Sequence, residues 1–224
     1  MSTDSFLPTY YDHDGIWLQR RQNQDPFWGP YSRRLYDQLS LKIAALPVPA
    51  GTAVADVGCG AGAFGLWLER LGFRYHGYDA SDAGIAWGKE LFPHLTLACL
   101  DLVRQPFPIE RNGFYSLVTA INSLHCLTDT AERAPFLRHI RECVREGGWL
   151  ILTTMCGPVE PDFKASKRPR IYLEPEEILA EIKEAGFAEI VSSELVGAHD
   201  RARIPNLTVI ARCAPGQPPI ESGR

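Results

Sequence analysis

Residues 54–64 read VADVGCGAGAF, and this stretch decides the fold. Its first four residues are apolar apart from Asp56, which is typical of a strand buried on both faces of a sheet. Glycines then follow at alternate positions, and a helical pattern runs from Gly65 to a stop at Gly72. This order brings a ligand close to bare backbone and to the positive end of a helix dipole. An ordinary tight turn would need fewer glycines, so the stretch predicts a ligand-binding loop.

The overall composition is that of one soluble α/β domain. The 224 residues can bury a sizeable core, and the net charge of −4 gives nucleic acid or an acidic membrane surface no general attraction. No apolar run is long enough to cross a bilayer, and the first residues lack the order of a signal peptide. The cysteines are scattered without a C-x-x-C pair, which predicts a cytoplasmic protein without disulfides or structural zinc.

Strand and helix patterns alternate along the rest of the chain. Beyond the strand at 54–57, further strands are expected at 73–79, 95–100, 114–121, 149–154, 187–195 and 206–213. Helices are expected at 31–46, 65–71, 82–92, 131–145 and 175–185. The alternation predicts a doubly wound, mostly parallel seven-stranded sheet with helices on both faces. The last two strands have no helix between them, so they should form a C-terminal antiparallel hairpin.

The chain divides into three parts on this interpretation. Residues 1–30 look irregular and rich in aromatic side chains, and we expect them to form a lid segment at the mouth of the site. Residues 31–213 form the single α/β domain, and residues 214–224 form a tail.

The ligand is expected at one edge of the sheet. In open sheets of this kind, ligands bind outside the carboxyl ends of the parallel strands. The site should therefore be built from the loops that follow each of the first five strands. The loop at 196–205 joins them, because the strand before it should run parallel to the first.

The sequence resembles the class I S-adenosylmethionine-dependent methyltransferases over residues 50–213. Residues 56–62, DVGCGAG, are similar to the D-x-G-x-G-x-G loop of that family. An acid ends the second strand at Asp79, and Asp101-Leu102 follows the third strand. Residues 145–150, REGGWL, resemble the family's R-P-G-G turn with glutamate in place of proline. The resemblance implies S-adenosyl-L-methionine as cofactor, S-adenosyl-L-homocysteine as product and a methyl acceptor as partner.

The resemblance also implies particular roles for the cofactor-binding residues. Asp56 would place a negative charge near the amine of the cofactor, and Asp79 would accept hydrogen bonds from both ribose hydroxyls. Asp101 and the Leu102 amide would bind the adenine edge. As alternatives, Asp79 could serve only as a helix cap, and Asp101 could be a loop acid facing water. The residues expected to bind the cofactor are Tyr11, Asp56, Gly58, Cys59, Gly60, Asp79, Ala80, Asp101, Leu102 and Asn122.

Two other functions stay open from the residues alone. Gly58-x-Gly60-x-x-Ala63 also fits the looser fingerprint of an NAD(P)-dependent oxidoreductase, and Asp79 lies at a suitable distance from it. The acid at Asp56, the third glycine at Gly62 and the end hairpin favour a methyltransferase instead. A non-catalytic nucleotide-binding module is the third possibility.

The acceptor side of the site is less readable. The best general base is His125, just beyond the fourth strand, although it could equally be a structural histidine. Candidate substrate-binding residues are Tyr10, His13, Arg170 and His199. Arg170 belongs to a basic run that could recognise a carboxylate or phosphate, or could be a solvated loop. We expect a small-molecule oxygen or nitrogen acceptor, and the oligomeric state stays open.

Overall fold

The computed structural model of the protein describes residues 13–27, 29–157, 170–196 and 205–214. A single sheet of seven strands lies at its centre in the order β3-β2-β1-β4-β5-β7-β6. The strands are β1 (Ala53–Val57), β2 (Arg74–Asp79), β3 (Thr96–Cys99), β4 (Tyr115–Ile121), β5 (Val144–Met155), β6 (Glu189–Val196) and β7 (Asn206–Arg212). The first five strands are parallel, and β7 runs antiparallel to both of its neighbours. The predicted fold class is confirmed.

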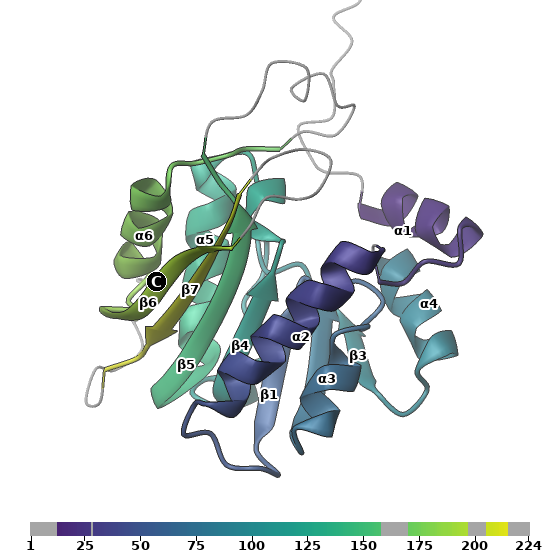
Figure 1. The fold of residues 1–224 in the computed structure, drawn as a ribbon, viewed down its shortest axis with the longest axis horizontal. Coiled ribbons are helices and arrows are strands. Elements are labelled where there is room, and N and C mark those ends of the chain that lie inside the picture. Colours follow the sequence, from purple (N-terminus) through teal and green to yellow (C-terminus); the bar gives the residue numbers. More distant parts are fainter. Residues whose placement is uncertain (1–12, 28, 158–169, 197–204, 215–224) are drawn as a thin grey trace, which may run out of the picture.

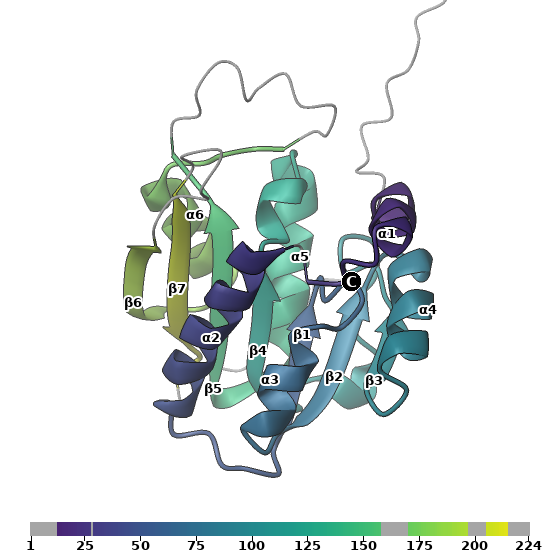
Figure 2. The ribbon, with the colours of Figure 1, turned by 45° about the vertical axis from the view of Figure 1, so that its right-hand side comes forward.

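Helices cover both faces of this sheet (Figures 1 and 2). They are α1 (His13–Gln22), α2 (Pro30–Ala44), α3 (Gly65–Arg70), α4 (Asp82–Leu91), α5 (Thr130–Cys143) and α6 (Pro175–Glu184). The helices α2, α3 and α4 contribute to the core on one face, and α5 and α6 to the core on the other. No helix in the described ranges is long and apolar enough to cross a membrane.

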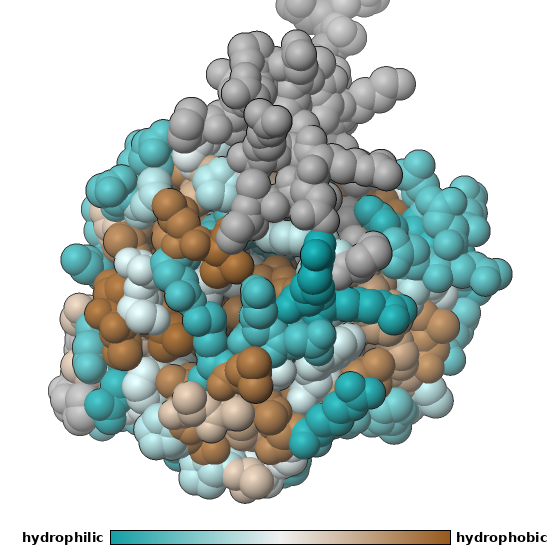
Figure 3. All heavy atoms as spheres, viewed as in Figure 1, coloured by the Kyte–Doolittle hydropathy of each residue, from teal (hydrophilic) through white to brown (hydrophobic). Residues whose placement is uncertain are grey.

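The helix α2 shows how the sequence pattern sets this packing. Leu35, Leu39 and Ile43 recur every four residues and are fully buried against the sheet. The outward side of the same helix is mostly hydrophilic, and Figure 3 shows hydrophilic side chains along this face of the molecule. The predicted helix at 31–46 is therefore confirmed to within two residues.

The amino-terminal segment departs from its prediction. Residues 1–30 were expected to be irregular, but residues 13–22 form α1. Only Ile16 and Trp17 of this helix are buried, and Leu18 is exposed. The apolar residues Ile16, Trp17 and Leu18 are consecutive, so the sequence shows no helical period here. Residues 1–12 and 215–224 of the predicted lid and tail lie outside the described ranges.

The helix α1 lies over α4 at the carboxyl ends of the parallel strands (Figures 1 and 2). The Asp14 carboxylate accepts hydrogen bonds from Ser81 Oγ at 2.6 Å and from the Ala83 N–H at 3.0 Å. The rings of Trp17 and Trp87 pack with their centroids 6.3 Å apart. Tertiary contacts thus hold a helix that has little apolar surface of its own.

The strand β5 also differs from its expected length. It begins at Val144 instead of 149, and α5 accordingly ends at Cys143. Val144 pairs with Tyr115, and the register then shifts before Leu117. Gly147 adopts a φ of +67° at this irregular stretch, so the turn expected here is a bend within a strand.

Candidate active site

A cavity of about 290 Å³ opens at the carboxyl ends of the parallel strands. Its floor is formed by the ends of β1, β2 and β4 and by the loop after β3. The helix α1 and the first turns of α2 form another wall. The structure therefore places a cavity where the sheet-end rule predicts one.

The glycine loop requires glycine for two reasons. Gly58, Gly60 and Gly62 have φ values of +71°, +58° and +77°, a region that other residues rarely adopt. In addition, a Cβ at Gly60 would lie 1.8 Å from the ring of Trp17. The Trp17 ring of α1 therefore packs directly on the loop at Gly60. Gly58 and Cys59, in contrast, line the cavity.

The Asp79 carboxylate lies in the cavity wall and is held by backbone donors. Its Oδ2 accepts the Gly60 N–H at 2.8 Å, and its Oδ1 accepts the Ser81 N–H at 2.8 Å. The side chain is almost fully buried, and this burial raises its pKa. The helix cap of α4 is Ser81, whose Oγ accepts the Gly84 N–H, so Asp79 does not serve as that cap.

Asp56 occupies a different place from the other acids. Its carboxylate is buried beneath the loop, where it accepts hydrogen bonds from Thr119 Oγ1 at 2.7 Å and from the Tyr75 hydroxyl at 3.2 Å. It is not among the described residues that line the cavity. Side chains alternate along β1, so Asp56 faces away from Val57, on the side of Val54. Burial raises the pKa of Asp56 to about 7.

Asp101 and Leu102 form a turn in the cavity wall just after β3. Both residues line it, together with Val103. Asp101 Oδ1 accepts the Val103 N–H at 3.0 Å, and Asp101 Oδ2 lies 3.4 Å from Arg104 Nε. The side chain of Leu102 is buried. Asp101 is therefore an acid of the cavity wall, which favours the binding role over that of a solvent-facing loop acid.

Asn122 and Ser123 carry polar atoms that nothing in the described ranges satisfies. Asn122 Oδ1 and Ser123 Oγ are buried and accept or donate no hydrogen bond there. Both residues line the cavity just beyond β4. Asn122 also holds a φ of +54°, which is uncommon for a residue other than glycine. Unsatisfied acceptors and backbone strain together are typical of a ligand-binding position.

His125 is buried in the wall beside the end of β5. Its Nδ1 lies 3.5 Å from the Met155 N–H, which can only donate, so this nitrogen acts as an acceptor. Burial, with a smaller contribution from the nearby Arg170 guanidinium, lowers the pKa of His125 to about 3. The ring stacks on that of Tyr172, with centroids 6.4 Å apart. A neutral ring with its proton on Nε2 is better suited to donate a hydrogen bond than to remove a proton.

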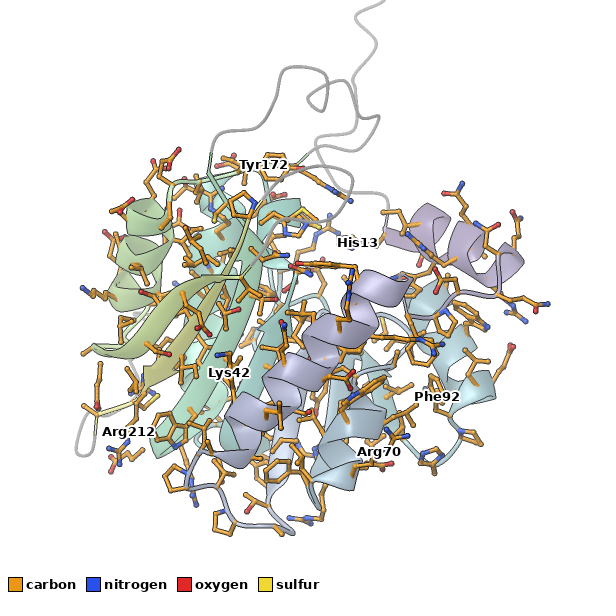
Figure 4. All side chains as sticks on the ribbon, viewed as in Figure 1. His13, Lys42, Arg70, Phe92, Tyr172 and Arg212 are labelled. Atoms are coloured by element: carbon orange, nitrogen blue, oxygen red, sulfur yellow. The ribbon has the colours of Figure 1, made fainter. Side chains whose placement is uncertain are left out.

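The candidate substrate residues fall into two groups. His13 and Arg170 both line the cavity, one from α1 and one from the segment before α6. Figure 4 shows His13 and Tyr172 at the same end of the sheet. Arg170 lies beside Met155, with 4.0 Å between Nη1 and Sδ. Tyr10, Tyr11 and His199 lie outside the described residues.

Several lining residues were not predicted from the sequence. Tyr31, Ser32 and Tyr36 reach the cavity from α2, and Phe136 reaches it from α5. The Tyr31 hydroxyl accepts a hydrogen bond from Asn206 Nδ2. Burial raises the pKa of Tyr36 far above its ordinary value, which keeps its hydroxyl protonated. The 32/36 spacing on one side of a helix was the signal that could have revealed this wall.

No metal site accompanies these groups in the part of the chain that the structure describes. Within it, no three His, Cys, Asp or Glu side chains cluster in a way that could hold a metal ion. The charged groups on the cavity wall are instead two carboxylates at the ends of β2 and β3, and basic side chains on the remaining walls.

Comparisons with known proteins agree on one family and one fold. Residues 29–192 match a family model described as a methyltransferase domain. The chain is similar in structure to a SAM-dependent methyltransferase from Methanosarcina mazei, with 14% identity, 75% of this chain and 95% of that chain covered, and a TM-score of 0.65. A search of curated proteins gives no match.

Two further solved structures share the fold. A methyltransferase of Haloferax volcanii, solved with the Trm112 methyltransferase activator, has 15% identity, covers 91% and 98% of the two chains, and has a TM-score of 0.69. Phosphoethanolamine N-methyltransferase 2 of Haemonchus contortus was solved with phosphomonomethylethanolamine and S-adenosylhomocysteine. It has 18% identity, covers 91% of this chain and 58% of that chain, and has a TM-score of 0.69. At such low identities these likenesses show the fold alone.

Proposed function

Because the chain belongs to the methyltransferase-domain family, we propose that it moves a methyl group from S-adenosylmethionine to an oxygen or nitrogen atom of a small molecule. The observation that carries this proposal is the pairing of two cavity acids with the glycine loop. Asp79 ends β2, and Asp101 comes two residues after Cys99, the strand partner of Asp79 on β3. Two acceptors on neighbouring strand ends suit the ribose and the base of one adenosine.

The ribose is assigned to Asp79. Each of its oxygens already accepts one backbone N–H, and a carboxylate oxygen can accept a second hydrogen bond. The two backbone bonds fix the plane of the carboxylate before a ligand arrives, so little ordering remains to be done on binding. Ala80, beside it on the cavity wall, leaves space for the sugar.

The amino-acid part of the cofactor is assigned to the loop and to Asn122. Asn122 Oδ1 is a buried acceptor that an ammonium group would satisfy. Gly58 and Cys59 present backbone at the same end of the cavity. The Asp56 carboxylate is bound to Thr119 and Tyr75 beneath this loop, so it makes no direct contact with the cofactor. It is proposed to act on the amine through the negative charge that it carries above its pKa of about 7.

S-adenosylmethionine supplies an activated methyl group on a positively charged sulfur, and the protein supplies alignment and exclusion of water. An acceptor lone pair attacks the methyl carbon, and the electrons of the breaking carbon–sulfur bond remain on sulfur. The proton of the acceptor passes to solvent. We propose that His125 contacts the acceptor, and its neutral ring favours orienting it by hydrogen bonding over acting as the base.

The acceptor is proposed to carry an anionic group. Arg170 lies on the cavity wall beside Met155, at the end of β5, and a guanidinium is well suited to a carboxylate or phosphate. His13 lines the same cavity from α1, on the side of Asp79, and is proposed as a second contact. Tyr10 and His199, outside the described residues, stay proposed as further contacts. Tyr11, which also lies outside the described residues, stays proposed as a cofactor contact.

The test is transfer of label from methyl-labelled S-adenosylmethionine to matched pairs of phenols and amines, with and without a carboxylate. We expect the compounds that carry a carboxylate to be methylated, and Arg170→Gln to lower the kcat/KM for these compounds by about tenfold or more. Arg145→Gln is the matched control, since Arg145 is exposed at the start of β5, whereas Arg170 lies beside Met155 at the end of that strand. Equal rates for acids and their uncharged partners would contradict the anionic acceptor, and label in protein or RNA alone would contradict the small-molecule class.

A further inference from the structure

We propose that His139 is a positioning residue that makes the site selective for adenine by fixing the carboxylate of Asp101. The inference rests on the proposed function, in which the Asp101–Leu102 turn binds the base of the cofactor. His139 lies on α5 and is 7% exposed. One turn before it on the same helix, Phe136 lines the cavity.

His139 reaches the turn through a single hydrogen bond. Its Nδ1 lies 2.7 Å from the Leu102 carbonyl oxygen. A carbonyl oxygen can only accept, so Nδ1 must carry a proton. Leu102 and His139 are far apart in sequence, and this bond joins the loop after β3 to α5, the helix that packs on one face of the sheet.

The bond continues to Asp101 through one peptide group. The Leu102 carbonyl and the Val103 N–H belong to the same planar peptide. The Val103 N–H donates to Asp101 Oδ1 at 3.0 Å. His139 therefore holds one side of a peptide plane whose other side holds the Asp101 carboxylate. A rotation of that plane would break both bonds together.

The preceding peptide is fixed as well. The Asp101 carbonyl accepts the N–H groups of Arg104 at 3.1 Å and Gln105 at 3.0 Å. In a trans peptide the N–H points away from the carbonyl, so the Leu102 N–H is directed away from residues 104 and 105. The turn thus sets a carboxylate acceptor and a backbone donor in a fixed relation.

This pattern distinguishes adenine from hypoxanthine. Adenine offers an amino donor beside a ring-nitrogen acceptor, which complements a carboxylate and an N–H. Hypoxanthine offers an oxygen acceptor beside an N–H donor, which is the reverse. A site that must leave buried polar groups unpaired rejects a ligand strongly, but only if its own groups cannot turn to accommodate it. The His139 bond prevents that turning.

The experiment compares the Kd of S-adenosylhomocysteine with that of S-inosylhomocysteine by calorimetry. The wild-type protein is expected to prefer the adenosyl compound by about tenfold or more. His139→Leu removes the donor at similar volume and should reduce this preference to less than about threefold. His139→Asn places an amide N–H near the Nδ1 position and should restore it.

Ile140→Ala is the control for lost stability. Ile140 is fully buried in the core on the same helix, so its truncation should lower the melting temperature while the preference stays as in the wild type. A His139→Leu protein that keeps the full preference would overturn the inference. If the wild-type protein binds neither compound, the proposed function fails instead.

A measurement on the wild-type protein covers the case in which His139→Leu does not fold. The ¹⁵N NMR spectrum of the histidine rings should show His139 with its proton on Nδ1. A neutral ring protonated only at Nε2 would overturn the inference.

Discussion

The Gly60 N–H donates to Asp79 Oδ2 at 2.8 Å, so the glycine loop and the acid at the end of the next strand form one unit. The loop after β1 lies beside the end of β2 because these strands are parallel neighbours. The same carboxylate accepts the Ser81 N–H, which ties it to the start of α4. An acid held in this way keeps its orientation without a ligand.

Asp79→Asn should weaken binding of S-adenosylhomocysteine by about tenfold or more. An amide must present its NH₂ group to either Gly60 or Ser81, both of which donate, so its plane cannot be held as that of the carboxylate is. Calorimetry measures the change. Asp82→Asn, at an exposed position in the first turn of α4, should bind as the wild type does. An unchanged affinity in Asp79→Asn would remove this residue from the ribose site.

Gly60→Ala should displace α1 as well as strain the loop. A new Cβ would lie 1.8 Å from the Trp17 ring, at a φ of +58°. Gly51→Ala is the matched control, because its φ is +78° and nothing lies within 4 Å of its Cβ. Strain alone costs about 1–2 kcal/mol. We expect Gly60→Ala to lower the melting temperature and the affinity for S-adenosylhomocysteine more than Gly51→Ala, and equal effects would show that Trp17 does not press on the loop.

Local patterns were enough to predict most of the fold and much of the site. The alternation of strands and helices gave the mostly parallel seven-stranded sheet with its C-terminal hairpin, and residues 56–62 gave the family, which is confirmed. Asp79, Asp101 and Asn122 were placed on the cavity by the rule that parallel strands end at one edge. These inferences depend only on neighbours in sequence or on chain direction.

Features that depend on long-range packing were not predicted. The helix α1 is held by Asp14 on Ser81 and by Trp17 on Gly60, contacts that no periodicity reveals. The bond between His139 and Leu102 joins residues that the sequence separates by a whole strand. Asp56 is different, because the alternation of side chains along β1 could have placed it opposite Val57.

His125 should make the protein less stable in acid. The unfolded state takes up a proton near pH 6.5, whereas burial lowers the folded-state pKa to about 3. Stability is therefore lost as the pH falls from about 6.5 towards 3, by up to about 1.4 kcal/mol per pH unit. His125→Gln should reduce the fall in melting temperature between pH 7 and pH 5. An unaltered fall in His125→Gln would contradict a neutral buried ring.

Asp56 should act in the opposite direction. Its folded-state pKa of about 7 lies above the ordinary value of 3.8, so its ionisation opposes folding. The stability that protonated Asp56 contributes is fully present below about pH 4 and is lost as the pH rises to 7. Asp56→Asn stays neutral and can still accept from Thr119 Oγ1, so it should be more stable than the wild type at pH 8, by at most about 4 kcal/mol. Urea unfolding at pH 5 and pH 8 measures this, and a variant that is less stable at both values would show that the carboxylate is ionised at no cost.

Calorimetry with S-adenosylhomocysteine and NADH tests the central claim most directly. The two acids, the glycine loop and the unsatisfied Asn122 Oδ1 predict that S-adenosylhomocysteine binds with one-to-one stoichiometry and that NADH gives no heat of binding. Binding of NADH with none of S-adenosylhomocysteine would contradict the account.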